Sequence, residues 1–318
     1  MSVSSLPFLH GALAAVLPKL AAWRRDFHAH PEAGWTEFRT AALIIRRLRE
    51  LGYAIRMGEA ACASDRRMGV PSSAVLAAAR ERALEHGADA ELVAGMGDGY
   101  TGFWADLDCG PGPVTAFRFD MDCNEVAECA EESHRPMREG FASRWPGLMH
   151  ACGHDGHAAV GLGLAEVLVS IRRHLRGRIR LIFQPAEEGA RGALPMSEAG
   201  AVDGVDVLFG FHIGFKAEGP GSLICGTQGF LATTKRDVLF SGVPAHAGAA
   251  PEEGKDALLA ACSAVVNLHA ISRNGKGGTR IAVGRLEGGE ARNVIPASAR
   301  LFMETRGETT ELDAYMTA

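Results

Sequence analysis

Hydrophobic positions recur at two spacings along the first two thirds of the chain, and each spacing predicts a different kind of element. Apolar residues three or four apart predict helices, whereas short apolar runs that end in polar residues predict strands. The pattern predicts helices over 6–20 with a break at Pro18, and over 40–51, 72–86 and 158–174. It predicts strands over 114–119, 178–183 and 205–213, with a charged insert of weak β character at 57–98.

This alternation of strands and helices is typical of an α/β domain, in which ligands gather outside the carboxyl ends of the strands. We therefore expect a mixed, mostly parallel sheet flanked by helices over residues 1–229. From about Gly229 the pattern changes to strands over 232–241, 280–286 and 297–304 with one long helix over 256–272. That order predicts a small α+β domain over 230–318.

Composition narrows the classes of function. The chain is 47% hydrophobic and 22% charged, with a net charge of −5, and its basic residues form no tail, so nucleic acid is not an expected partner. Seven scattered cysteines predict reduced thiols in a cytoplasmic protein. Because no run of 18 apolar residues occurs, a membrane span is not expected either.

The segment MHACGHDGH carries the sharpest chemical signal. It places Cys152, His154, Asp155 and His157 within six positions, directly before an apolar helix. Thiolate, imidazole and carboxylate groups are ligands of zinc, manganese and cobalt. A histidine-rich turn or a helix cap is the plain alternative.

Polar residues also follow the predicted strands. Glu187 and Glu188 come just after strand 178–183, where one could bind metal and the other act as general base. A solvated pair that opens a helix is the alternative. His212 ends strand 205–213, although a lone histidine there is more often structural. Asp120 and Asp122 end strand 114–119 with both carboxylates on one side, suited to orient a ligand histidine.

The small domain offers three more candidates. His246 lies in the loop VPAHAG, where a surface turn histidine is the alternative. Asn293 and Arg306 together suit recognition of a carboxylate, because a guanidinium can bind one through two hydrogen bonds. Their alternatives are a turn residue and a solvated strand end.

Taken together, these motifs resemble a known family. HAHPE, RFDMD, MHACGHDGH, QPAEEG, GFHIG, AHAG and NVIP occur in the order found in the aminoacylase and glutamate-carboxypeptidase-like metallopeptidases. The chain resembles most their amidohydrolase branch, in which a cysteine replaces the usual bridging aspartate. The resemblance covers essentially all 318 residues.

The resemblance implies two divalent ions, manganese or zinc with cobalt as a further option, bridged by Cys152 and held further by His154, Glu188 and His212. Glu187 would be the base. His246 would steady the oxyanion in the neighbouring subunit of a homodimer, or of a heterodimer with a related protein. Asn293 and Arg306 would bind the substrate carboxylate. Supporting roles would fall to Asp120, Asp122, Asp155 and His157.

The implied reaction is hydrolysis of the amide bond of a small N-acyl or aroyl amino acid, with p-aminobenzoyl-glutamate favoured. A general N-acyl-amino-acid deacylase and an inactive subunit that acts only in assembly are the rivals. No G-x-S-x-G motif favours a serine hydrolase. The resemblance implies that relatives continue beyond the equivalent of Ala318, to complete the catalytic domain and a ferredoxin-like lid and to supply a last ligand histidine. We therefore expect both domains to be incomplete here and the 318-residue chain to have little or no activity.

Overall fold

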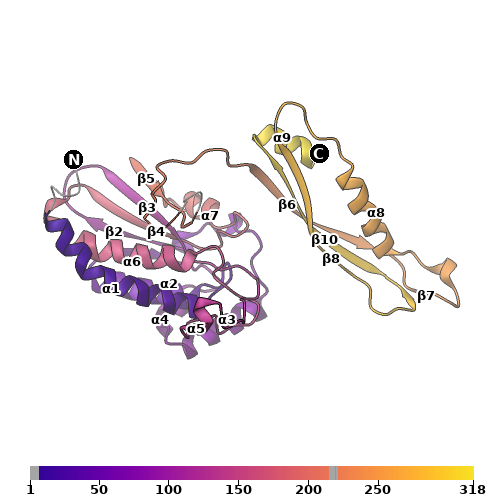
Figure 1. Cartoon of the computed structure of the whole chain (residues 1–318), viewed down its shortest axis with the longest axis horizontal. Coiled ribbons are helices and arrows are strands. Elements are labelled where there is room, and N and C mark those ends of the chain that lie inside the picture. Colours follow the sequence, from indigo (N-terminus) through magenta and orange to yellow (C-terminus); the bar gives the residue numbers. More distant parts are fainter. Residues whose placement is uncertain (1–6, 215–218, 220) are drawn as a thin grey trace. The chain divides into compact units, whose positions relative to one another are not determined.

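The computed structural model describes residues 7–214, 219 and 221–318, and the chain divides into two compact units, Met1–Ala217 and Glu218–Ala318. Each unit has its own sheet and its own hydrophobic core (Figure 1). The boundary expected from the sequence, between 229 and 230, lies further along the chain than this division. It falls in a segment, 222–231, that forms neither helix nor strand.

The first unit is built on a five-stranded sheet with the order β1-β2-β4-β3-β5. Its strands are β1 (Ala54–Met57), β2 (Phe103–Asp108), β3 (Val114–Asp120), β4 (Arg178–Gln184) and β5 (Val207–Gly210). β3 runs parallel to β4 and to β5, whereas β2 runs antiparallel to β1 and to β4. The expected mixed sheet is confirmed, with parallel and antiparallel pairings in equal number and not mostly parallel.

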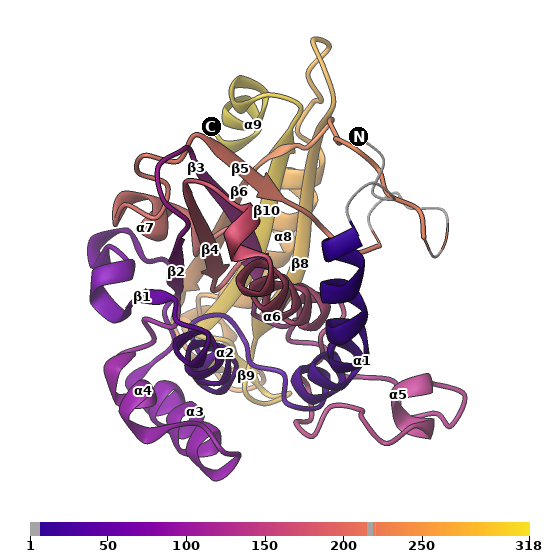
Figure 2. The ribbon, with the colours of Figure 1, turned by 90° about the vertical axis from the view of Figure 1, so that its left-hand side faces the viewer.

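Helices cover both faces of this sheet (Figures 1 and 2). On one face, Phe103, Phe119 and Phe183 pack against Ile44 and Leu162 from the helices. On the other face, residues of β2, β3 and β4 pack against the short helix α7 (Ala193–Glu198). The remaining helices of this unit are α1 (Pro7–Ala29), α2 (Phe38–Glu50), α3 (Ser73–Glu85), α4 (Ala90–Gly95), α5 (Arg135–Arg138) and α6 (His154–Ser170).

Several elements differ from the prediction, and β1 and β2 were not predicted at all. α1 continues through Pro18, where a break was expected. Proline removes one helical hydrogen bond, but Ala14, whose carbonyl loses that partner, is exposed. Val16, two residues further on, is buried against α6 and holds the helix in place. α6 begins at His154 and not at Ala158, and β5 is shorter than predicted. The charged insert holds α3 and α4, and all of 58–98 is described without a strand.

The second unit contains a three-stranded antiparallel sheet with the order β6-β10-β8. Its elements are β6 (Ala232–Ser241), β7 (Ala245–His246), α8 (Ala257–His269), β8 (Thr279–Gly288), β9 (Val294–Ile295), β10 (Ser298–Gly307) and α9 (Thr310–Thr317). Ala257 and Ala261 of α8 pack on Ala299 and Leu301 of β10. The predicted strands are confirmed, and a β-α-β-β-α order with the third strand between the first two fits the ferredoxin-like expectation.

Candidate metal centre

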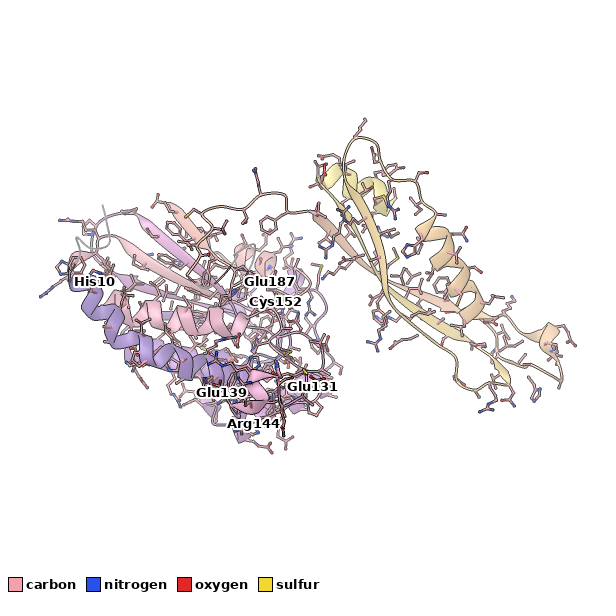
Figure 3. All side chains as sticks on the ribbon, in the orientation of Figure 1. His10, Glu131, Glu139, Arg144, Cys152 and Glu187 are labelled. Atoms are coloured by element: carbon pink, nitrogen blue, oxygen red, sulfur yellow. The ribbon has the colours of Figure 1, made fainter. Side chains whose placement is uncertain are left out.

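The candidate ligands of the first unit gather at the end of the sheet where three parallel strands finish. Asp120 is the last residue of β3, Glu187 follows β4 by three positions, and His212 follows β5 by two. His154 begins α6 at the same end. Cys152 and Glu187 are labelled there in Figure 3. Because parallel strands end together, residues far apart in the sequence meet at this edge.

Donor atoms converge on His154. In each of three overlapping groups, one donor atom from every residue lies within 4.8 Å of the others: Cys152, His154 and His212; Asp120, His154 and His157; and His154, Glu187 and Glu188. Cys152 Sγ lies 3.4 Å from His212 Nε2. The sulfur, the imidazoles and the two glutamates therefore surround one space.

His154 is held so that one ring nitrogen faces that space. Its Nδ1 donates to the backbone oxygen of Asp122 at 2.8 Å. Its Nε2 is buried and has no hydrogen-bond partner among the described residues, with carboxylate oxygens of Glu187 and Asp120 at 3.7 and 3.9 Å. Burial alone lowers the pKa of His154, but Asp122 and Asp120 raise it to about 9, which shows how negative the surroundings are.

Acidic groups dominate the site. Glu188 donates its backbone N–H to Asp122 Oδ2 at 2.9 Å, while its own Oε1 is buried without a hydrogen-bond partner among the described residues. Burial, together with Asp120, raises the pKa of Glu187. Burial and the neighbouring glutamates also raise the pKa of the Cys152 thiol. A divalent cation would offset both effects, so the donor set fits a metal of the zinc, manganese or cobalt type.

His157 has both ring nitrogens occupied. Its Nδ1 lies 3.0 Å from Asp120 Oδ2, and its Nε2 accepts the Ile213 N–H at 3.1 Å. Arg118 in turn pairs with Asp120. His157 thus links α6, β3 and the segment after β5, and its side chain is suited to hold the other residues in place.

Asp155 faces away from the donor atoms. Its Oδ2 accepts from Arg24 Nε at 3.2 Å and lies 2.8 Å from His28 Nδ1. His28 Nε2 reaches Glu128 at 2.9 Å. Asp155 therefore connects the start of α6 to α1, and His28 of α1 connects both helices to the loop around Glu128.

Two residues that support the site were missed from the sequence. Asn124 Oδ1 accepts the backbone N–H of Cys152 at 3.0 Å, and Glu37 accepts the backbone N–H of Ala186 at 2.7 Å. Both act on backbone groups of residues distant in the sequence. The sequence shows only that Asn124 is a polar residue beside a chemical motif and that Glu37 comes just before an amphipathic helix.

In the second unit, His246 and Asn293 lie together. β7 pairs with β9, and Ala247 donates its N–H to the Asn293 carbonyl at 3.0 Å. His246 Nδ1 accepts the N–H groups of Gly248 and Ala249 at 3.1 and 3.0 Å. A neutral ring with Nδ1 as acceptor carries its proton on Nε2, which makes that exposed nitrogen a donor.

Arg306 lies elsewhere in that unit. It is near the far end of β10 and donates to Glu304 at 2.7 Å, whereas Asn293 comes just before β9 and the start of β10. At a rise of about 3.3 Å per residue, Arg306 is roughly 25 Å along the strand from Ser298. The structure therefore does not bring Asn293 and Arg306 together in one chain.

Comparison with known proteins shows which family has this arrangement of fold and site. Residues 116–305 match the model of peptidase family M20/M25/M40. The chain belongs to peptidase family M20/M25/M40. The family resemblance drawn from the motifs is confirmed, and as a member of the M20/M25/M40 family the chain is a metal-dependent hydrolase of amide bonds.

Two relatives share about half of their aligned residues with this chain. An indole-3-acetyl-aspartic acid hydrolase of Enterobacter agglomerans is 49% identical, over 98% of this chain and 71% of the relative. One of the subunits of the p-aminobenzoyl-glutamate hydrolase of Escherichia coli strain K12 is 50% identical, over 95% of this chain and 69% of the relative.

Two solved structures are informative. An aminobenzoyl-glutamate utilization protein from Klebsiella pneumoniae is 44% identical with a TM-score of 0.80, covering 97% of this chain and 72% of the other. A dinuclear metal-binding M20 peptidase from Bacillus subtilis is 29% identical with a TM-score of 0.55, covering 94% and 66%. M20/M25/M40 proteins thus include dinuclear metal sites on the fold described above.

Proposed function

We propose that this chain hydrolyses the amide bond between an aromatic acyl group and an acidic amino acid, with p-aminobenzoyl-glutamate as the favoured substrate. The convergence of Cys152, His154 and His212 beside Glu187 is the observation that carries the reaction type. The two relatives at about half identity are named for indole-3-acetyl-aspartate and p-aminobenzoyl-glutamate. Both compounds join an aromatic acyl group to an acidic amino acid.

Two divalent ions are proposed as cofactors. Cys152 would bridge them, and His154, Glu188 and His212 would complete the ligands that this chain offers. When bound, such ions polarise the substrate carbonyl and lower the pKa of water toward about 7. Zinc, manganese and cobalt all accept this set of ligands.

Glu187 is proposed as the general base. Its side chain is 35% exposed, so it reaches both the donor cluster and solvent. Its raised pKa suits a carboxylate that takes a proton from the attacking water and gives it to the leaving nitrogen. His246, with its donor Nε2, would stabilise the oxyanion, and the loss of such a donor typically costs about 10²–10³ in rate.

The substrate carboxylate is proposed to bind Asn293 and Arg306 from two different chains. Asn293 comes just before β9 and the start of β10, whereas Arg306 is roughly 25 Å along β10 from Ser298, so a single carboxylate is not expected to reach both in one chain. A dimer, whether of two copies or of this chain with a related protein, would bring them together.

A cytoplasmic location is proposed, which the free thiols among the described residues fit. Among those residues no helix is long and apolar enough to cross a bilayer.

Turnover and metal content together test the proposal. The protein should hydrolyse p-aminobenzoyl-glutamate faster than aliphatic N-acetyl amino acids. Glu187→Gln should retain bound metal yet lose turnover by at least about 10³-fold, and Cys152→Ala should lose metal as well. Glu198→Gln, a change at an exposed glutamate of α7, is the matched control and should behave as wild type. Normal turnover by Glu187→Gln would refute the base assignment.

The rival functions give different results in the same assays. A general deacylase would prefer the aliphatic substrates, and a protein that acts only in assembly would show neither turnover nor a dependence of metal content on Cys152.

A further inference from the structure

The turn that carries both glutamates contains a residue in an unfavourable backbone conformation. Ala186 has φ of +45° and is completely buried. In this left-handed region the Cβ of an L-residue is crowded by the following carbonyl oxygen. Gly34 packs so closely that a Cβ added to it would lie 2.9 Å from both Cα and Cβ of Ala186. The surroundings must therefore hold Ala186 in place.

Hydrogen bonds fix Ala186 on both sides. Its N–H donates to Glu37 Oε1 at 2.7 Å, and its carbonyl accepts the N–H groups of Arg191 and Gly192 at 3.1 Å. Two residues further on, Glu188 donates to Asp122 Oδ2. Two carboxyl groups thus hold the turn on either side of Glu187, and the bond from Ala186 goes to a side chain that can be replaced without altering the turn itself.

Glu37 is placed for this contact. It comes directly before α2 and has no exposed surface. Its second oxygen accepts from Thr101 Oγ1 at 2.6 Å. Burial, reinforced by the negative charge of Asp122, raises the pKa of Glu37 to about 8. A neutral carboxyl group keeps a carbonyl oxygen that can accept the Ala186 N–H.

We propose that Glu37 is a positioning residue for the catalytic turn: by accepting the Ala186 N–H it holds Ala186 in the left-handed conformation and so fixes the direction of the Glu187 side chain. Only the consequence for turnover rests on the proposed function of Glu187. The consequence for the backbone stands on the hydrogen bond alone.

Glu37→Met is the decisive variant, because methionine has a similar length and no strong acceptor. Hydrogen exchange of the amides at 186–188 should become at least about tenfold faster. Turnover should fall about 10²-fold with KM changed less than about threefold, as expected for a misplaced catalytic group. Bound metal should stay at the wild-type level, since Asp122 still holds Glu188.

Two matched variants separate positioning from burial. Glu37→Gln keeps an oxygen that can accept the Ala186 N–H, and exchange and turnover should stay within about threefold of wild type. Thr101→Val removes the other hydrogen bond of Glu37 and leaves the turn untouched, so exchange at 186–188 should not change. Faster exchange in Thr101→Val, equal to that in Glu37→Met, would overturn the proposal.

Rescue provides a further test. Glycine adopts positive φ without a steric cost, so Ala186→Gly added to Glu37→Met should recover turnover at least about threefold. A merely structural role for Glu37 would show no such rescue. If Glu37→Met does not fold, recovery of folded protein by the double variant supports the proposal, and its failure overturns it.

Unchanged exchange at 186–188 in folded Glu37→Met would also overturn the proposal. If wild type shows no hydrolysis, the proposed function fails, and the exchange measurement still decides the role of Glu37.

Discussion

At the scale of single residues, Asp26 of α1 and Arg39 of α2 form a two-pronged ion pair. The two terminal guanidinium nitrogens each lie 2.9 Å from one carboxylate oxygen, and Arg39 is buried. Burial alone would raise the pKa of Asp26, but hydrogen bonds from His30 and Arg39 lower it well below its ordinary value of 3.8. A carboxylate with a depressed native pKa contributes stability that is present above 3.8 and is lost as the pH falls through the native value.

Asp26→Asn should therefore destabilise the protein at pH 7 by about 0.5–1 kcal/mol, a modest amount because the Asp26 side chain is 42% exposed. The difference from wild type should shrink as the pH is lowered below 3.8. Urea unfolding at neutral and acid pH measures it. Glu50→Gln, at a more exposed ion pair with Arg47, serves as the control with little change. A difference independent of pH would contradict the account.

At the scale of elements, the contact of α6 with the sheet leaves no room at Gly161. A Cβ at this position would lie 2.7 Å from Cε1 of the buried Phe183 ring. At Gly11 in α1, by contrast, a Cβ would have no atom of the described residues within 4 Å. The two glycines are both helical and differ only in what surrounds them.

Gly161→Ala should lower the free energy of unfolding by about 1–2 kcal/mol, because overpacking outweighs the better helix propensity of alanine. Gly11→Ala should raise it by about 0.5–1 kcal/mol through propensity alone. Urea titrations of both variants measure the difference. Equal effects of the two substitutions would show that α6 tolerates a shift away from β4.

Elements and site were predictable from the sequence to different degrees. β6 was predicted to the residue because its two threonines and its Val-Leu-Phe run favour a strand. β2 was missed because Asp106 reads as a charged loop residue, whereas in the sheet it pairs with Arg180 of β4. Cys152 could be named as a candidate because it stands in a motif of ligand types, and His212 because it ends a predicted strand, as the glutamate pair does. Glu37 was not, because its role depends on the backbone of a turn 149 residues away.

At the scale of the whole molecule, the two units provide separate reporters. All four tryptophans, Trp23, Trp35, Trp104 and Trp145, belong to the first unit, which also contains the candidate metal centre. Tryptophan fluorescence therefore follows the unfolding of that unit alone.

Removal of metal should lower the unfolding midpoint seen by tryptophan fluorescence. A ligand present at 100 times its dissociation constant stabilises the native state by about 2.7 kcal/mol, and a chelator removes that contribution. Cys152→Ala should show no further shift on chelation. A wild-type midpoint unaffected by the chelator would count against a metal in the first unit.

Mixing two inactive variants should restore activity if His246 acts in the neighbouring protomer. Each dimer of one Glu187→Gln chain and one His246→Ala chain contains one site with both groups intact. Random exchange of protomers should then return about one quarter of wild-type turnover. No recovery after exchange, checked by mass spectrometry of the mixed dimer, would place His246 and Glu187 in the same chain's site.

The length of β10 between Arg306 and the Asn293 loop also bears on how activity scales with the amount of protein. If residues of two chains hold the substrate carboxylate, it is bound only while those chains stay associated. Turnover per chain would then decline on dilution below the dissociation constant of the pair, so that rate plotted against concentration curves upward where a self-contained enzyme would give a straight line.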